Sequence, residues 1–183
     1  KVKEKYESLP VQVRASFWFL ICSFLQRGIS MITTPVFTRI MSTSDYGQYG
    51  VFNSLLGIIS IIVTLSLTAG VHVQGLVKYN QDRKGFSSSL QGLTVTLVFV
   101  WFVIYLIFRS FWNELLSVTT LQMVLMFIII WMSAIFAFWA NEQRVEYSYR
   151  ILVIITLISA IIKPTIEVVF VLHSNDKAIA RII

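Results

Sequence analysis

Apolar side chains fill five long stretches of this chain, and short polar segments separate them. A helix of about 20 predominantly apolar residues is long enough to cross the hydrocarbon core of a bilayer. Backbone groups in lipid must bond within their own segment, so each stretch is expected to be a helix. The predicted spans are residues 16–41, 49–73, 90–111, 121–140 and 151–172. The pattern predicts an all-α fold, a polytopic transmembrane bundle of about five spans without a soluble domain.

The first predicted span carries a stripe of polar side chains on an otherwise apolar helix. At 100° per residue, Gln26, Arg27, Ser30 and Thr34 share roughly a third of the helix circumference. A guanidinium at the bilayer centre costs roughly 3 kcal/mol or more, so such a group normally faces a bundle interior or a wet cavity. The Ser and Thr positions have an alternative interpretation, close packing against other helices. Arg27 needs a different explanation, because a packing contact requires no guanidinium.

The next segments contain a helix breaker and a polar turn. Pro35 removes a backbone donor and predicts a kink in the first span. Residues 42–48 include Asp45 and no basic side chain, so they are expected to form an outer loop. Small polar residues follow at helical spacing in the second span and either pack closely or line a cavity. They are Asn53, Gly57, Ser60, Thr64 and Thr68. His72, near the inner end, is interpreted as a packing or interfacial residue in preference to a proton carrier.

The fifth predicted span contains the charged pair Lys163 and Glu167, next to Pro164. Residues four apart on a helix are close enough to form an ion pair. A proline at membrane depth is tolerated where the backbone is covered by protein or lines a cavity. The pair is therefore either structural or part of a transport route.

Composition and charge agree with a membrane protein. Hydrophobic residues make up 56% of the chain and charged residues 13%, whereas soluble domains carry about 25% charged residues. The net charge of +6 does not indicate a nucleic-acid partner, because the basic residues lie mostly in short loops. The N-terminal lead and the loops at 76–89 and 141–150 are basic, which predicts a cytoplasmic N-terminus. We see no metal cluster, catalytic grouping or phosphate-binding glycine loop, so the sequence predicts no cofactor and no enzyme activity.

One run of the sequence resembles a known family. The segment TPVFTRIMSTSDYGQYGVFNSLLGI is similar to the start of polysaccharide-unit flippases, the Wzx-like branch of the multidrug/oligosaccharidyl-lipid/polysaccharide (MOP) exporter superfamily. The matching positions are Pro35, Phe37, Thr38, Arg39, Asp45, Tyr46, Gly47 and Tyr49. The later spans and short basic inner loops fit the same pattern over the whole chain.

The resemblance implies a carrier that moves an undecaprenyl-pyrophosphate-linked oligosaccharide across the bacterial plasma membrane for surface polysaccharide biosynthesis, as with O-antigen or exopolysaccharide. Its implied partners are this lipid-linked substrate and membrane lipids, with the polysaccharide polymerase and chain-length machinery as candidates. Arg27 would attract the pyrophosphate or a sugar acid, and Lys163 would be a second cation. Hydrogen bonds to sugar hydroxyls would come from Gln26, Ser30 and Thr34. The motif at the outer gate would comprise Pro35, Arg39, Asp45, Tyr46 and Gly47.

Three alternative functions have different requirements. A cation-coupled multidrug exporter of the same superfamily commonly carries a membrane-embedded acid in an early helix, whereas here Glu167 is the acid within a predicted span. An enzyme acting on lipid-linked sugars would need paired acids or a metal site. A non-transporting scaffold is the third. Carriers of this family usually have two bundles of six or more helices, so five spans are expected to be the front part of a longer protein or a truncated product.

Overall fold

The computed structural model describes residues 10–174 and 176–182, which form helices joined by short turns. Five helices are long and apolar enough to cross a membrane. These five are α2 (Val11–Ile40), α3 (Thr43–Thr64), α5 (Arg83–Ile107), α7 (Thr120–Val145) and α8 (Tyr149–His173). Three shorter helices are α4 (Val71–Lys78), α6 (Arg109–Leu116) and α9 (Lys177–Ile182). The expected polytopic helical bundle is thus confirmed.

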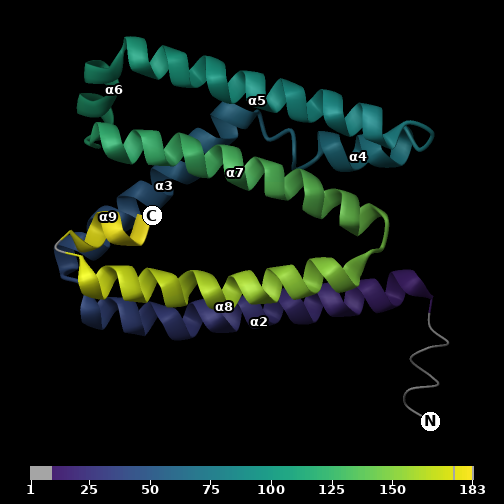
Figure 1. Ribbon diagram of the computed structural model, residues 1–183, viewed down its shortest axis with the longest axis horizontal. Helices are drawn as coiled ribbons and strands as arrows, with labels where there is room; N and C mark the ends of the chain where they lie inside the picture. The colour runs from purple at the N-terminus through teal and green to yellow at the C-terminus, as the bar shows by residue number, and fades with distance from the viewer. Residues whose placement is uncertain (1–9, 175, 183) are drawn as a thin grey trace.

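The helices form two groups that α9 joins at one end (Figure 1). The helices α2 and α8 lie side by side along their length and run in the same direction. In the other group α5 and α7 run antiparallel, and α3 and α4 pack against both of them. The short helix α9 folds back from α8 and contacts α3. A wall of α3, α9 and α8 therefore forms near the C-terminus of the chain.

Apolar packing follows these two groups. The larger core lies between α3, α5 and α7, where Phe52, Met126 and Phe127 are buried. A smaller core at the end of the molecule joins α2, α8 and α9 through Phe37, Val171 and Ala180. Many other large apolar side chains are exposed on the long helices. Such a surface is expected where lipid covers the helices.

The predicted outer loop at residues 42–48 is wrong, because helix α3 already begins at Thr43. The hydroxyl of Ser42 accepts a 3.1 Å hydrogen bond from the Asp45 backbone N–H, and it donates a 2.7 Å bond to the Asp45 carboxylate. An N-cap serine satisfies a free N–H of the first turn, and an acid there interacts favourably with the helix dipole. The polar residues therefore start the helix.

The second span also ends earlier than the predicted residue 73. Helix α3 stops at Thr64, and Leu65 and Ser66 adopt left-handed backbone conformations (φ 49° and 50°). Such φ values are unfavourable for a branched side chain like leucine. The turn is held from elsewhere, because the Asn141 side chain donates a 2.7 Å hydrogen bond to the Thr68 carbonyl. A tertiary contact thus accompanies a break that the apolar sequence does not reveal.

The two inner loops are shorter than predicted. The inner loop expected at 76–89 is reduced to a turn at 79–82, which Asp82 ends by accepting a 3.0 Å hydrogen bond from the Gly85 N–H. Helix α7 continues to Val145 instead of 140. Helix α8 runs without a break through Lys163 and Pro164, and α2 runs through Pro35.

Candidate functional site

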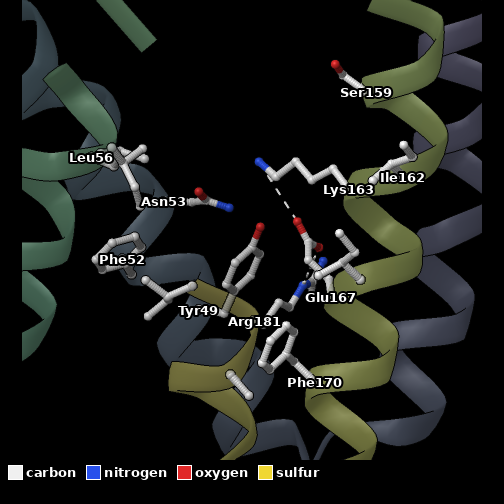
Figure 2. A pocket seen from close by; sticks show the side chains of 14 residues that line it. Tyr49, Phe52, Asn53, Leu56, Ser159, Ile162, Lys163, Glu167, Phe170 and Arg181 are labelled. Atoms are coloured by element: carbon white, nitrogen blue, oxygen red, sulfur yellow. Dashed lines mark ion pairs between the residues drawn. The ribbon is translucent and has the colours of Figure 1, made fainter. Parts of the chain in front are cut away.

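A cavity of about 410 Å³ opens between the two helix groups, beside α9. Figure 2 shows the side chains around it, with the amine of Lys163, the amide of Asn53 and the hydroxyl of Tyr49 directed toward its centre. Its walls come from α3, α7, α8 and α9. The lining residues are Tyr49, Phe52, Asn53, Leu56, Ile129, Ser159, Ile162, Lys163, Ile166, Glu167, Phe170, Ala180, Arg181 and Ile182. The site therefore combines an apolar wall with a few polar groups, as ligand sites in proteins generally do.

Three charged side chains form a row on one side of the cavity. Glu167 Oε1 lies 3.9 Å from Lys163 Nζ, and Glu167 Oε2 lies 3.9 Å from Arg181 Nε. The Lys163–Glu167 pair is present, as its four-residue spacing predicts. The side chains of Arg181 and Glu167 are only 9% and 12% exposed, whereas that of Lys163 is 78% exposed. Two cations and one carboxylate leave the row with one excess positive charge, and the most accessible group is Lys163.

Arg181 is held in place mainly by aromatic rings. Its guanidinium carbon lies 3.8 Å from the ring centroids of Phe37 and Tyr49, and 5.1 Å from that of Tyr46. A cation over an aromatic face gains about 0.5–2 kcal/mol, more when water is excluded. The rings belong to α2 and α3, so this one side chain links them to α8 through Glu167. The neighbouring Lys177 adds a second link by donating a 2.7 Å hydrogen bond to the Ile40 carbonyl at the end of α2.

The polar stripe of α2 does not line this cavity. Arg27, Ser30 and Thr34 are exposed and Gln26 is half-buried, because α2 packs on α8 through other positions, including Ala15 and Cys22. The Thr34 hydroxyl donates a 2.9 Å hydrogen bond to the Ser30 carbonyl. Of the five predicted cavity residues, only Lys163 borders the cavity.

The stripe nevertheless lies on the side of α2 that faces α9. Ser30 precedes Phe37 by seven residues, almost two turns, so the two positions point in nearly the same direction. Phe37 is buried against Arg181, which lines the cavity. Arg27 lies about 60° further around the helix from Ser30. The stripe is thus an exposed polar track that leads along α2 toward the Arg181 wall.

The motif residues of the family resemblance gather at the α2–α3 junction. Pro35 and Arg39 are exposed in the last turns of α2, and Gly47 is exposed early in α3. The Asp45 carboxylate bonds to Ser42, and Tyr46 faces Arg181. Tyr46 of this motif therefore supports the docking of α9 through its contact with Arg181.

Arg181 is the site residue that the sequence did not reveal. It lies in a tail that looks polar and then turns apolar, and nothing local shows that this tail folds back over α3. The available signal was the spacing of Lys177 and Arg181, which places two cations on one side of a short helix.

The family comparison agrees with the multi-pass helical bundle. Residues 13–180 match the model of the family described as "Polysaccharide biosynthesis protein". No curated protein and no solved structure matches the chain. The match covers nearly the whole chain, including almost all of α2 and the first four residues of α9, and it ends one residue before Arg181. A multi-pass helical architecture in this family favours a transporter over an enzyme. The chain belongs to the polysaccharide biosynthesis protein family.

Proposed function

We propose that this chain is part of a flippase that carries undecaprenyl-pyrophosphate-linked oligosaccharide repeat units across the plasma membrane. The observation that carries the proposal is a cavity with an excess positive charge, placed among membrane-spanning helices of a polysaccharide biosynthesis protein. A pyrophosphate is anionic and hydrated, so its passage through lipid requires a polar route with fixed cations.

Lys163 is the group best placed to meet the substrate. Its amine is exposed in the cavity, and its partner Glu167 lies four residues away. Glu167 keeps Arg181 as an ion-pair partner when the exposed Lys163 amine moves away, so the amine can leave the carboxylate at little cost. A ligand anion at 4 Å attracts the amine by about 4 kcal/mol at an effective dielectric constant of 20. The half-buried Gln26 and the exposed Arg27, Ser30 and Thr34 would bind the substrate along the track before it reaches this cavity.

A cationic drug is a poorer match for the same cavity. Glu167 is the acid in the cavity wall, and it already faces two cations at 3.9 Å. A cationic ligand would therefore compete with Lys163 and Arg181 for one carboxylate. The charge balance supports an anionic substrate.

The test uses the complete protein in its native bacterium. Lys163→Met should reduce surface polysaccharide about tenfold, which corresponds to a loss of about 1.4 kcal/mol in binding, while lipid-linked repeat units accumulate inside the cell. Arg27→Ala tests the α2 track in the same way. Lys163→Arg should retain most of the activity, because it keeps the positive charge.

Arg109→Met is the matched control, since Arg109 is an exposed cation in α6, away from the cavity. Membrane abundance of every variant is measured by immunoblot. Normal polymer levels in both Lys163→Met and Arg27→Ala, at matched abundance, would refute the proposed function.

We also propose that the N-terminus faces the cytoplasm. The start of α2, the 79–82 turn and the 146–148 turn lie at one end of the molecule (Figure 1). These segments are flanked by basic residues, namely Arg14, Lys78, Arg83, Lys84, Arg144 and Arg150. Basic loops stay on the cytoplasmic side. A cysteine introduced at Lys78 in a Cys22→Ser chain should resist a membrane-impermeant maleimide in intact cells and react in opened cells. Labelling in intact cells would show that this end of the molecule faces outward, which contradicts the proposed orientation.

A further inference from the structure

Helix α4 packs against α5 and α7 at the end of the molecule opposite α9 (Figure 1). A second polar cluster, which shares no residue with the cavity lining, lies between these three helices. His72 is fully buried (0% exposed), and its Nε2 lies 3.1 Å from Ser87 Oγ. The Ser87 hydroxyl donates a short hydrogen bond to the Glu142 carboxylate. Two aromatic rings flank the imidazole, with centroid distances of 4.6 Å for Phe138 and 6.4 Å for Phe86. Three helices thus meet at one hydrogen-bonded chain inside an aromatic shell.

The hydrogen bonds of Ser87 fix where the protons are. A serine hydroxyl has one hydrogen to donate and can accept two hydrogen bonds. Its hydrogen points to Glu142, and the Gln91 amide donates to the same oxygen at 3.2 Å. His72 Nε2 must therefore donate to the remaining lone pair. The neutral ring then carries its proton on Nε2, and its bare Nδ1 is buried without a hydrogen-bond partner among the described residues.

An added proton on His72 Nδ1 breaks this arrangement. It creates a second buried N–H, beside the apolar rings of Phe86 and Phe138. A buried donor without an acceptor is costly, so protonation of His72 favours a rearrangement of the three helices.

The cluster has a route to water at the basic end of the bundle. Glu142 lines a small cavity of about 60 Å³ between α4, α5 and α7. The charged groups that share this cavity are Arg83 and Lys84 from α5 and Glu146 from α7, and on α4 itself Lys78 is exposed. Arg83 Nε donates a 3.1 Å hydrogen bond to the Leu76 carbonyl of α4. Burial lowers the pKa of His72, and the nearby Glu142 carboxylate opposes that shift.

We propose that His72, Ser87 and Glu142 form a single proton-binding site, and that proton uptake loosens α4 from α5 and α7. The site sits outside the cavity that would bind a lipid-linked sugar. Its ligand is a proton from water, so its operation does not depend on the proposed substrate.

The chain's two histidines make a direct titration possible. Ring NMR signals of the full chain in nanodiscs are followed against pH, and His173→Gln assigns them. The midpoint of His72 should lie below pH 6.5, the ordinary pKa of a histidine side chain. Glu142→Gln removes the opposing carboxylate and should move the His72 midpoint to still lower pH. A His72 midpoint at or above pH 6.5, or no effect of Glu142→Gln on it, would overturn the proposal.

The loosening of α4 has its own readout, which remains usable if Glu142→Gln does not fold. In a Cys22→Ser chain, Leu76→Cys places a thiol at a position that is 1% exposed, and Val77→Cys places one at a position that is 65% exposed. The labelling rate of Leu76→Cys is divided by that of Val77→Cys, because thiol ionisation affects both rates in the same way. This ratio should rise as the pH falls through the His72 midpoint, and it should become independent of pH in His72→Gln. A ratio that does not change with pH when His72 is present contradicts the proposed loosening.

Discussion

Replacing Arg181 by methionine should release α9 from its position over α3. The change removes a guanidinium that lies 3.8 Å from two ring centroids and 3.9 Å from Glu167 Oε2. Glu167, whose side chain is 12% exposed in the unchanged protein, then keeps Lys163 as its remaining ion-pair partner among the described residues. Breaking a buried pair by removing one partner costs about 3–5 kcal/mol, because the other charge stays buried. Methionine retains part of the packing on the rings, so we expect a loss of about 3 kcal/mol in the docking of α9.

The docking free energy is measured by thiol accessibility. Ile182→Cys is introduced in a Cys22→Ser chain, where the side chain at position 182 is 7% exposed. Maleimide labelling of the full chain in detergent micelles reports the fraction of molecules in which α9 is open. A loss of about 3 kcal/mol corresponds to an increase of more than 100-fold in that fraction. Lys177→Met is the comparison variant, because it removes the 2.7 Å bond to Ile40 and keeps the Arg181 cluster.

A second mutation separates charge burial from loss of packing. Glu167→Gln in the Arg181→Met chain removes the carboxylate that has lost one of its two cations, so the double variant should recover a large part of the lost docking energy. Arg181→Lys keeps the charge but not the planar guanidinium, and it should give an intermediate loss. If the double variant is as open as Arg181→Met, the Glu167 charge is not the cause and the reasoning fails.

Two further predictions concern the packing of α4. A side chain at Gly75 would place its Cβ 2.0 Å from the Phe86 ring, so Gly75→Ala should lower the free energy of unfolding by about 1–3 kcal/mol. Denaturant titration followed by tryptophan fluorescence measures this loss. If Phe86→Leu does not restore the stability of the Gly75→Ala chain, the clash with Phe86 is not the cause. The lowered pKa of His72 means that the unfolded chain binds more protons than the folded chain just below pH 6.5. The stability contributed by the neutral His72 ring is therefore complete above pH 6.5 and is lost as the pH falls below it. In thermal melts from pH 5 to 7.5, His72→Gln should flatten this pH dependence of stability. An unchanged slope in His72→Gln would refute the prediction.

The sequence by itself predicted the architecture, because span length and apolar content are local properties. Each of the five spans appears as a helix, and the four-residue spacing of Lys163 and Glu167 was enough to predict their ion pair. The helix starts were encoded locally as well, in Ser42 and Asp82. The cap at Ser42 was misinterpreted as part of a loop, since polar residues in a first helical turn look like a loop when only hydropathy is considered.

The tertiary structure decided which polar residues meet. Arg181 contacts Phe37 and pairs with Glu167 because α9 folds back between α3 and α8, and no local pattern encodes that fold-back. His72 on α4 joins Glu142 on α7 through Ser87 on α5, because the packing of these three helices brings the side chains together. The stripe with Arg27 shows the reverse case: its periodicity was evident in the sequence, but only helix packing determined that its side chains do not line the cavity. Periodicity fixes the direction of a side chain from its own helix, whereas its neighbours depend on how apolar faces pack between helices distant in sequence.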